Sequence, residues 1–220
     1  EKVTRFYKYL EDEQCNKGLQ ELHLLLQDVR NIAGSIALLK ECHSSCSDVD
    51  FYELKCLALV AAKVSRLAEM HSLQLEDMPS LEAPLSILDI DGERLPSFFV
   101  SDGYSASLAQ LRKEIERAKT DEERDRLAMA AAQEEDRVRR RLTKELAPFA
   151  DDFSRVLGAL AMDDLLLAKA RWAYEHHYCC PTPLSADSET DFYDLIHPEV
   201  AEKLTERGEH FQPVSIRFGA

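Results

Sequence analysis

Apolar residues recur at three- and four-residue steps through much of this chain, and this spacing constrains its fold more than any other feature. Residues 1 to about 41 carry one such stripe and residues 50–71 carry a second. This period places apolar side chains on one face of an α-helix. The stripes comprise Leu19, Leu22, Leu25, Leu26, Val29, Ile32, Ile36 and Leu39, and then Phe51, Leu54, Leu57, Ala58, Ala61, Val64, Leu67 and Ala68. We therefore expect two long antiparallel helices, the second capped by Ser47 or Asp48.

The scarcity of glycine agrees with a helical fold. The chain has seven glycines in 220 residues, less than half the roughly 7% of average proteins. Leu, Ala, Glu, Lys and Arg, which favour helices, are abundant. No Walker A loop, G-x-G-x-x-G, H-E-x-x-H or C-x-x-C motif occurs. The sequence therefore predicts a mainly α protein, a bundle of long helices, with no catalytic residues and no enzymatic activity of its own.

Two stretches depart from the helical period. Residues 85–100 alternate briefly and then contain Asp91-Gly92, a dipeptide typical of hairpin turns, so we expect a small two-stranded hairpin there. Residues 181–220 contain four prolines and short apolar pieces, which indicate the start of a strand-containing domain. The expected order is a helical core over 1–104, a charged arm over 105–148, a returning core helix over 149–180 and this tail.

The arm is dominated by charged residues. Between Arg112 and Glu145, 21 of 34 positions are charged, 11 of them basic and 10 acidic. Thr120 and Glu123 have the spacing of a capping box, so we expect a new helix to start there. The sparse apolar positions predict a helical pair with one narrow packed seam.

Net charge and cysteine usage limit the partners and the compartment. The formal charge of -14 at pH 7 repels phosphate, so nucleic acid cannot be held by overall charge. No stretch approaches 18 consecutive apolar residues, and we expect no membrane partner. The six cysteines fit reduced thiols of the cytoplasm better than a disulfide framework. Because the chain begins at Glu1 without a leader, we expect it to be a piece of a longer protein.

One basic cluster is concentrated enough to contact phosphates. It comprises Arg137, Arg139, Arg140, Arg141 and Lys144. Acidic residues at 134–136 precede it, and pairing between positions i and i+4 would neutralise several of its charges. We favour a solvated helix face over a nucleic-acid site, and we expect weak or no binding to duplex DNA at physiological salt.

Residues 176–180, His-His-Tyr-Cys-Cys, form the group most like a metal site, since His176 and Cys180 would share a helix face. Zinc needs four ligands, and the others would have to come from Cys42, His43 and Cys46. We favour ordinary helix-end residues and expect no metal.

Asp164 is expected on the apolar face of the last helix, beside Leu160 and Leu167. It could be a buried acid in a site, or a carboxylate that is partly exposed or paired with Lys169 or Arg171. We favour the second interpretation because no histidine or nucleophile accompanies it.

The segment 162–173, MDDLLLAKARWA, resembles MutS-type mismatch-repair proteins, in which an aspartate, an apolar run and Ala-Lys-Ala-Arg end the helix that leads out of the lever domain. The segments 196–198 and 211–216 are similar to the first strands of the ATPase domain of that family. The stretch 85–101, followed by a charged helix, resembles the branch without a mismatch-recognition domain.

The resemblance implies that the helices are the lever and core of a MutS-like ATPase, which relay nucleotide-driven movement to DNA or another nucleic-acid target. The arm takes the position of a reduced clamp. The parent protein would use ATP and Mg²⁺ and form a homodimer through its ATPase domain. Phe211 and Gln212 would lie at the adenine edge of an incomplete nucleotide site, and this segment would hold no cofactor.

Two other classes remain open. A free-standing helical protein–protein adaptor, with no nucleotide or DNA role, explains the low glycine content and the charged arm, but not the proline-rich tail. A helical metal-dependent enzyme requires metal binding by His176 and Cys180.

Overall fold

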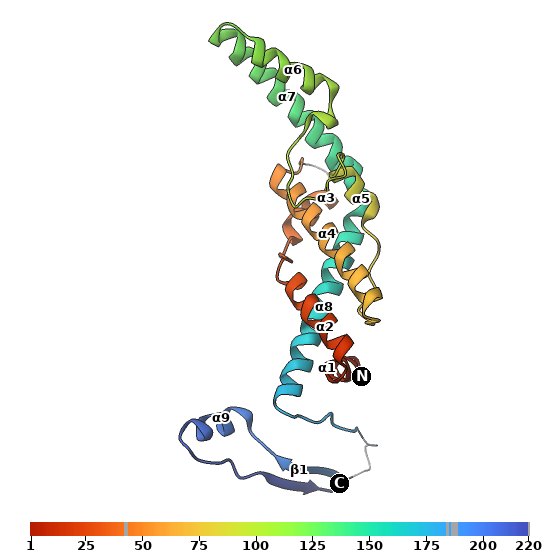
Figure 1. Cartoon of the computed structure of the whole chain (residues 1–220), viewed down its shortest axis with the longest axis vertical. Coiled ribbons are helices and arrows are strands. Elements are labelled where there is room, and N and C mark those ends of the chain that lie inside the picture. The colour runs from red at the N-terminus through yellow and green to blue at the C-terminus, as the bar shows by residue number, and fades with distance from the viewer. Residues whose placement is uncertain (42–43, 184, 186–188, 220) are drawn as a thin grey trace. The chain divides into compact units, whose positions relative to one another are not determined.

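The structure is a computed structural model that describes residues 1–41, 44–183, 185 and 189–219 (Figure 1). It is mainly α-helical with one small antiparallel sheet, which confirms the predicted fold class. The chain forms two compact units, Glu1–Tyr178 and Cys179–Ala220. The helices of the first unit are α1 (Lys2–Glu11), α2 (Glu13–Leu26), α3 (Ala33–Glu41), α4 (Asp48–Met70), α5 (Glu82–Leu88), α6 (Ala106–Arg117), α7 (Asp121–Leu146) and α8 (Ala150–Glu175).

The prediction of one helix over residues 1–41 is wrong, because three helices occupy this stretch. Asp12 takes extended backbone after α1, and its carboxylate accepts a hydrogen bond at 2.8 Å from the Cys15 N–H to cap α2. Residues 27–32 then separate α2 from α3, and the Asn31 side chain accepts a bond from the Ala33 N–H at 3.2 Å. Asp and Asn start helices by satisfying such free N–H groups.

α4 runs through the middle of the first unit, where α2, α3, α5 and α8 all pack against it. Its predicted start is confirmed: Ser47 caps it, and Ser47 and Asp50 exchange hydrogen bonds as a capping box. Its buried side chains cover most of its circumference and include Lys55. A helix with so little exposed surface is held in place by its neighbours on several sides.

The hairpin expected at residues 85–100 is wrong. Residues 82–88 form α5, and no strand occurs in 85–100, all of which the structure describes. Pro84 lies in the first turn of α5, where a missing N–H costs no helical hydrogen bond. Gly92, with φ 67°, makes the expected turn, but Asp89 points inward to Lys55 and no second strand pairs with the first.

α6 and α7 pair along the arm, which extends away from the other helices of the first unit (Figure 1). The predicted helix start at Thr120 is confirmed, because its hydroxyl accepts a bond from the Glu123 N–H at 3.2 Å. Ser105 caps α6 in the same way. Between the two helices Leu108 is buried, and Leu111 and Ile115 are half-buried, so the packed seam is as narrow as predicted.

α7 passes into α8 through a single turn of 3-10 helix, Ala147–Phe149. Pro148 falls in this turn, and Ala147 and Ala150 on either side keep right-handed helical backbone. The run Asp121–Glu175 is therefore interrupted only there, and at 1.5 Å per residue it would measure about 80 Å. The inner face of α8 packs on α1, α2, α3 and α4.

The second unit contains β1 (Thr190–Leu195), α9 (Pro198–Glu206) and β2 (Val214–Phe218). The strands pair antiparallel, with Phe192 opposite Ile216 and Thr190 opposite Phe218. No described residue of this unit is buried. The strand-containing character predicted for residues 181–220 is confirmed.

Gly18 on α2 should resist a substitution that normally stabilises helices. A Cβ at Gly18 would lie 2.7 Å from both Cβ and Cγ of His71, and the His71 Nδ1 is held by the Gln14 carbonyl at 3.0 Å. Alanine gains about 1 kcal/mol of helix propensity over glycine, but overpacking costs about 1–3 kcal/mol. We expect Gly18→Ala to lower the free energy of unfolding by about 1 kcal/mol in urea denaturation.

Gly158 on α8 provides the matched control, because nothing lies within 4 Å of the Cβ it would gain. Gly158→Ala should raise the free energy of unfolding by about 0.5–1 kcal/mol. Equal stabilisation by both substitutions would show that α2 and His71 separate without cost.

Candidate functional site

The basic cluster of α7 is largely neutralised by neighbouring carboxylates. The ion pairs are Arg137–Glu134 at 3.0 Å, Arg139–Asp136 at 2.7 Å, Arg139–Asp48 at 2.8 Å, Arg139–Glu135 at 3.4 Å and Arg141–Glu145 at 3.7 Å. The bond to Asp48 raises the pKa of Arg139 and ties α7 to the start of α4. Arg140 and Lys144 are exposed. The cluster thus presents few unpaired cations for phosphate groups.

Phe211 and Gln212 lie in the second unit, directly before β2, whereas the basic cluster belongs to the first unit. Phe211 is half-buried and Gln212 is exposed.

His176 is placed by aromatic stacking at the end of α8. Its ring lies on Trp172 with centroids 4.0 Å apart, and its Nδ1 donates a hydrogen bond to the Trp172 carbonyl at 2.9 Å. The Cys180 thiol donates to the Pro181 carbonyl at 3.7 Å. Among the described residues no three His, Cys, Asp or Glu side chains gather as metal ligands would. Cys42 and His43 lie outside the described residues.

The expectation that Asp164 lies on the apolar face of α8 is wrong by one position. Asp164 is exposed, and Asp163 has no exposed surface. The Asp163 carboxylate accepts a bond from the Glu76 backbone N–H, with Oδ1 at 3.0 Å and Oδ2 at 3.3 Å, and so fastens the connection between α4 and α5 to α8. Burial raises the pKa of Asp163 to about 6, while the Glu76 N–H, Arg5 and Lys2 act in the opposite direction.

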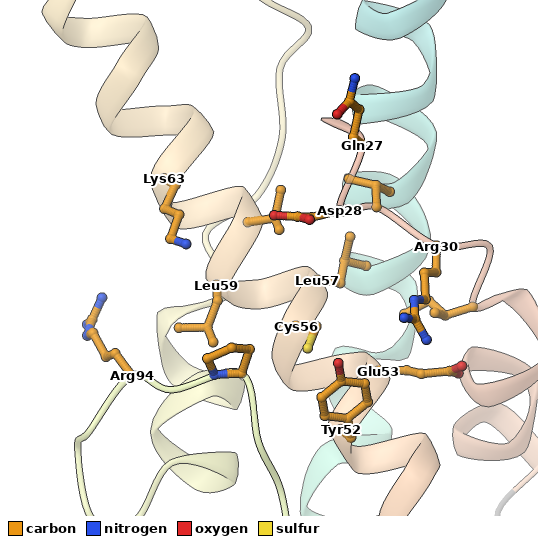
Figure 2. A pocket seen from close by; sticks show the side chains of 14 residues that line it. Gln27, Asp28, Arg30, Tyr52, Glu53, Cys56, Leu57, Leu59, Lys63 and Arg94 are labelled. Atoms are coloured by element: carbon orange, nitrogen blue, oxygen red, sulfur yellow. The ribbon is translucent and has the colours of Figure 1, made fainter. Parts of the chain in front are cut away.

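A pocket of about 290 Å³ opens beside α4 in the first unit (Figure 2). The connection between α2 and α3, the outward face of α4 and residues 94–96 enclose it. The apolar residues at the pocket are Val29, Ile32, Leu57, Leu59, Val60 and Pro96. The polar ones are Gln27, Asp28, Arg30, Tyr52, Glu53, Cys56, Lys63 and Arg94.

Two cations at this pocket have side chains without a polar partner in the part of the chain that the structure describes. The side chains of Arg30 and Lys63 form no hydrogen bond or ion pair with any residue that the structure describes. In contrast, Arg94 pairs with Glu82 at 2.6 Å, and Glu53 accepts a bond from the Ser35 hydroxyl at 2.7 Å. The charged residues at the pocket without an ion-pair partner among the described residues are therefore Arg30, Lys63, Asp28 and Glu53.

Tyr52 and Cys56 lie one turn apart on α4 and face the pocket together (Figure 2). The hydrogen bond between the phenol and the thiol raises the pKa of Tyr52, with Asp28 acting in the same direction and Arg30 against it. All four side chains line the same pocket. In the sequence, positions 52, 56 and 63 carry polar side chains one and two turns apart on one side of this helix. The helix has other polar residues as well, including Glu53, Lys55 and Arg66, so this spacing alone does not single out the site.

Comparisons with protein-family models, curated proteins and solved structures gave no match to this chain. Within the described part of the chain, no helix combines the length and hydropathy needed to cross a lipid bilayer.

Proposed function

We propose that this chain is the helical lever and core of a MutS-like, mismatch-repair-related ATPase, and that it relays nucleotide-driven movement to DNA or another nucleic-acid target. The observation that carries the proposal is the nearly continuous helical run Asp121–Glu175, which joins the arm to the helix that packs on α1–α4. α7 and α8 each resist bending because their residues are hydrogen-bonded to the next turn, and only the 3-10 turn Ala147–Phe149 separates them. Movement at Glu175 would therefore reach the arm.

The sequence supports the same proposal at a second point. The segment 162–173, which carries the resemblance to MutS-type proteins, lies entirely on α8. Its buried residues Leu166, Leu167 and Ala170 pack within the core. The segment that resembles MutS-type proteins is thus part of the long helical run, which is the part of the chain that would transmit movement in the proposed lever.

The proposal extends to the parent protein. It would be a cytoplasmic homodimer that binds ATP with Mg²⁺, with Phe211 and Gln212 at the adenine edge and no hydrolysis by this segment alone. Since the cluster Arg137–Lys144 is mostly paired, we attribute duplex-DNA contact to the parent protein rather than to this cluster.

ATP hydrolysis by the protein in its natural reading frame tests this proposal. We expect Mg²⁺-dependent hydrolysis that this 220-residue chain lacks, and in a gel shift we expect this chain to bind duplex DNA no tighter than micromolar at physiological salt. Absence of both ATP binding and hydrolysis in the natural protein would overturn the family assignment. Submicromolar DNA binding by the chain would overturn the assignment of DNA contact to the parent.

A further inference from the structure

The pocket beside α4 plays no part in the proposed lever, and we propose that it binds a small organic monoanion with an apolar body. The proposal depends on the chemistry of its lining, on its unpaired charges and on how firmly its walls are held.

The size and the apolar lining define the body of the ligand. Ile32, Leu57 and Val60 line the pocket and are only 3%, 4% and 6% exposed. Binding sites for small molecules are lined mainly by such side chains and measure roughly 300–1,000 Å³. A pocket of about 290 Å³ lies at the lower edge of this range, so it suits a body of no more than two or three aromatic rings.

The available charges define the head group. Arg30 and Lys63 lack an ion-pair partner among the described residues, whereas Arg94 is paired with Glu82, so two unpaired cations line the pocket beside the carboxylates of Asp28 and Glu53. A carboxylate or sulfonate would be attracted, because a charge-assisted hydrogen bond to Arg or Lys is about twice as strong as a neutral one. The carboxylates of Asp28 and Glu53 repel a second negative charge on the ligand, so a monoanion is favoured over a dianion.

The walls are in place before any ligand arrives. Tyr52, Cys56 and Lys63 belong to α4, which is packed on several sides. The residues opposite are held by backbone bonds from the Asp28 N–H to the Leu25 carbonyl at 3.2 Å and from the Val29 N–H to the Leu26 carbonyl at 3.1 Å. Preorganised groups bind more tightly because little conformational freedom is lost.

The dye 8-anilinonaphthalene-1-sulfonate, a monoanion with an aromatic body, is a suitable probe. Fluorescence titration of the folded chain should show saturable binding at one site, and Arg30→Gln and Lys63→Gln should each weaken it by about tenfold. Arg66→Gln, an exposed cation of α4 outside the pocket, is the matched control and should leave the affinity unchanged. N-phenyl-1-naphthylamine, which lacks the sulfonate, should bind at least about tenfold more weakly.

Cys56 reports where the dye binds. Alkylation by iodoacetamide, followed by mass spectrometry, should be slowed by the dye at Cys56 and not at the exposed Cys179. Equal affinities for the charged and uncharged dyes, no effect of Arg30→Gln and Lys63→Gln, or an unprotected Cys56 would each overturn the proposal. The experiment involves no nucleotide, so its result does not depend on the lever.

Discussion

Replacing Lys55 by methionine should lower the free energy of unfolding by about 3–5 kcal/mol. The Lys55 ammonium lies 2.8 Å from the Asp89 carboxylate, and the two side chains are only 7% and 6% exposed. Methionine fills similar space but leaves the buried carboxylate without its counter-ion. An uncompensated buried charge costs far more than a lost exposed ion pair. Urea denaturation at pH 7 measures the loss.

The pH dependence of this loss follows from Asp89. Burial alone would raise its pKa, but bonds from Lys55 and from the Arg94 backbone N–H at 2.8 Å outweigh burial and hold the pKa of Asp89 below its usual range. A depressed pKa contributes stability that is present above the unfolded value of about 3.9 and is lost as pH falls through the folded value. In Lys55→Met the ammonium no longer opposes burial, which raises the pKa of Asp89, so the difference between wild type and the variant should begin to shrink above about pH 4 and continue to shrink below it.

Two further variants separate charge from packing. Lys55→Met/Asp89→Asn removes both charges and should recover most of the loss, since the buried carboxylate is gone. Lys17→Met breaks the exposed pair with Glu13 and should cost less than about 0.5 kcal/mol. A double variant as unstable as Lys55→Met alone would show that lost packing, not the unpaired charge, causes the effect.

The Lys55–Asp89 ion pair belongs to the part of the fold that the sequence could not predict, because the two residues are far apart in the chain. α4 was predictable because its stripe and its Ser47 cap are both local. The two helix ends within residues 1–41 were not predicted, because the apolar period continues across them. Asp12, which caps the start of α2, was the one local signal for the first of these ends. Residues 87–90 alternate for too few positions to distinguish strand from helix end, and the inward direction of Asp89 depends on Lys55, which is distant in sequence.

The candidate site was predictable only in part, because its members come from separate segments. The polar positions 52, 56 and 63 are spaced one and two turns apart on α4, but only the packing of the chain brings Arg30 and Asp28 to the same pocket. The buried position of Asp163 on α8 was predictable from the sequence. Counting in alternating steps of three and four from Phe153 through Leu160 arrives at Asp163, not at Asp164, and then at Leu167.

Asp163→Asn should stabilise the chain at neutral pH by up to about 3 kcal/mol. Asparagine keeps an oxygen for the Glu76 N–H and removes a buried negative charge. The groups that face Asp163 are Glu76 from the connection between α4 and α5, and Arg5 and Lys2 from α1. Their charges do not cancel the cost of burial, because the pKa is raised to about 6.

The sign of the effect makes this prediction specific. A carboxyl whose pKa is higher in the folded chain binds more protons there than in the unfolded chain, so wild-type stability falls as pH rises between about 4 and 6. Asp163→Asn removes this fall, and the two proteins should have similar stability at pH 4 and diverge by pH 7. Asp164→Asn, an exposed neighbour on the same helix, is the control and should change stability little at either pH. If Asp163→Asn instead destabilises the chain by the same amount at pH 4 and pH 7, the ionised carboxylate is well solvated by its neighbours, and its burial does not limit stability.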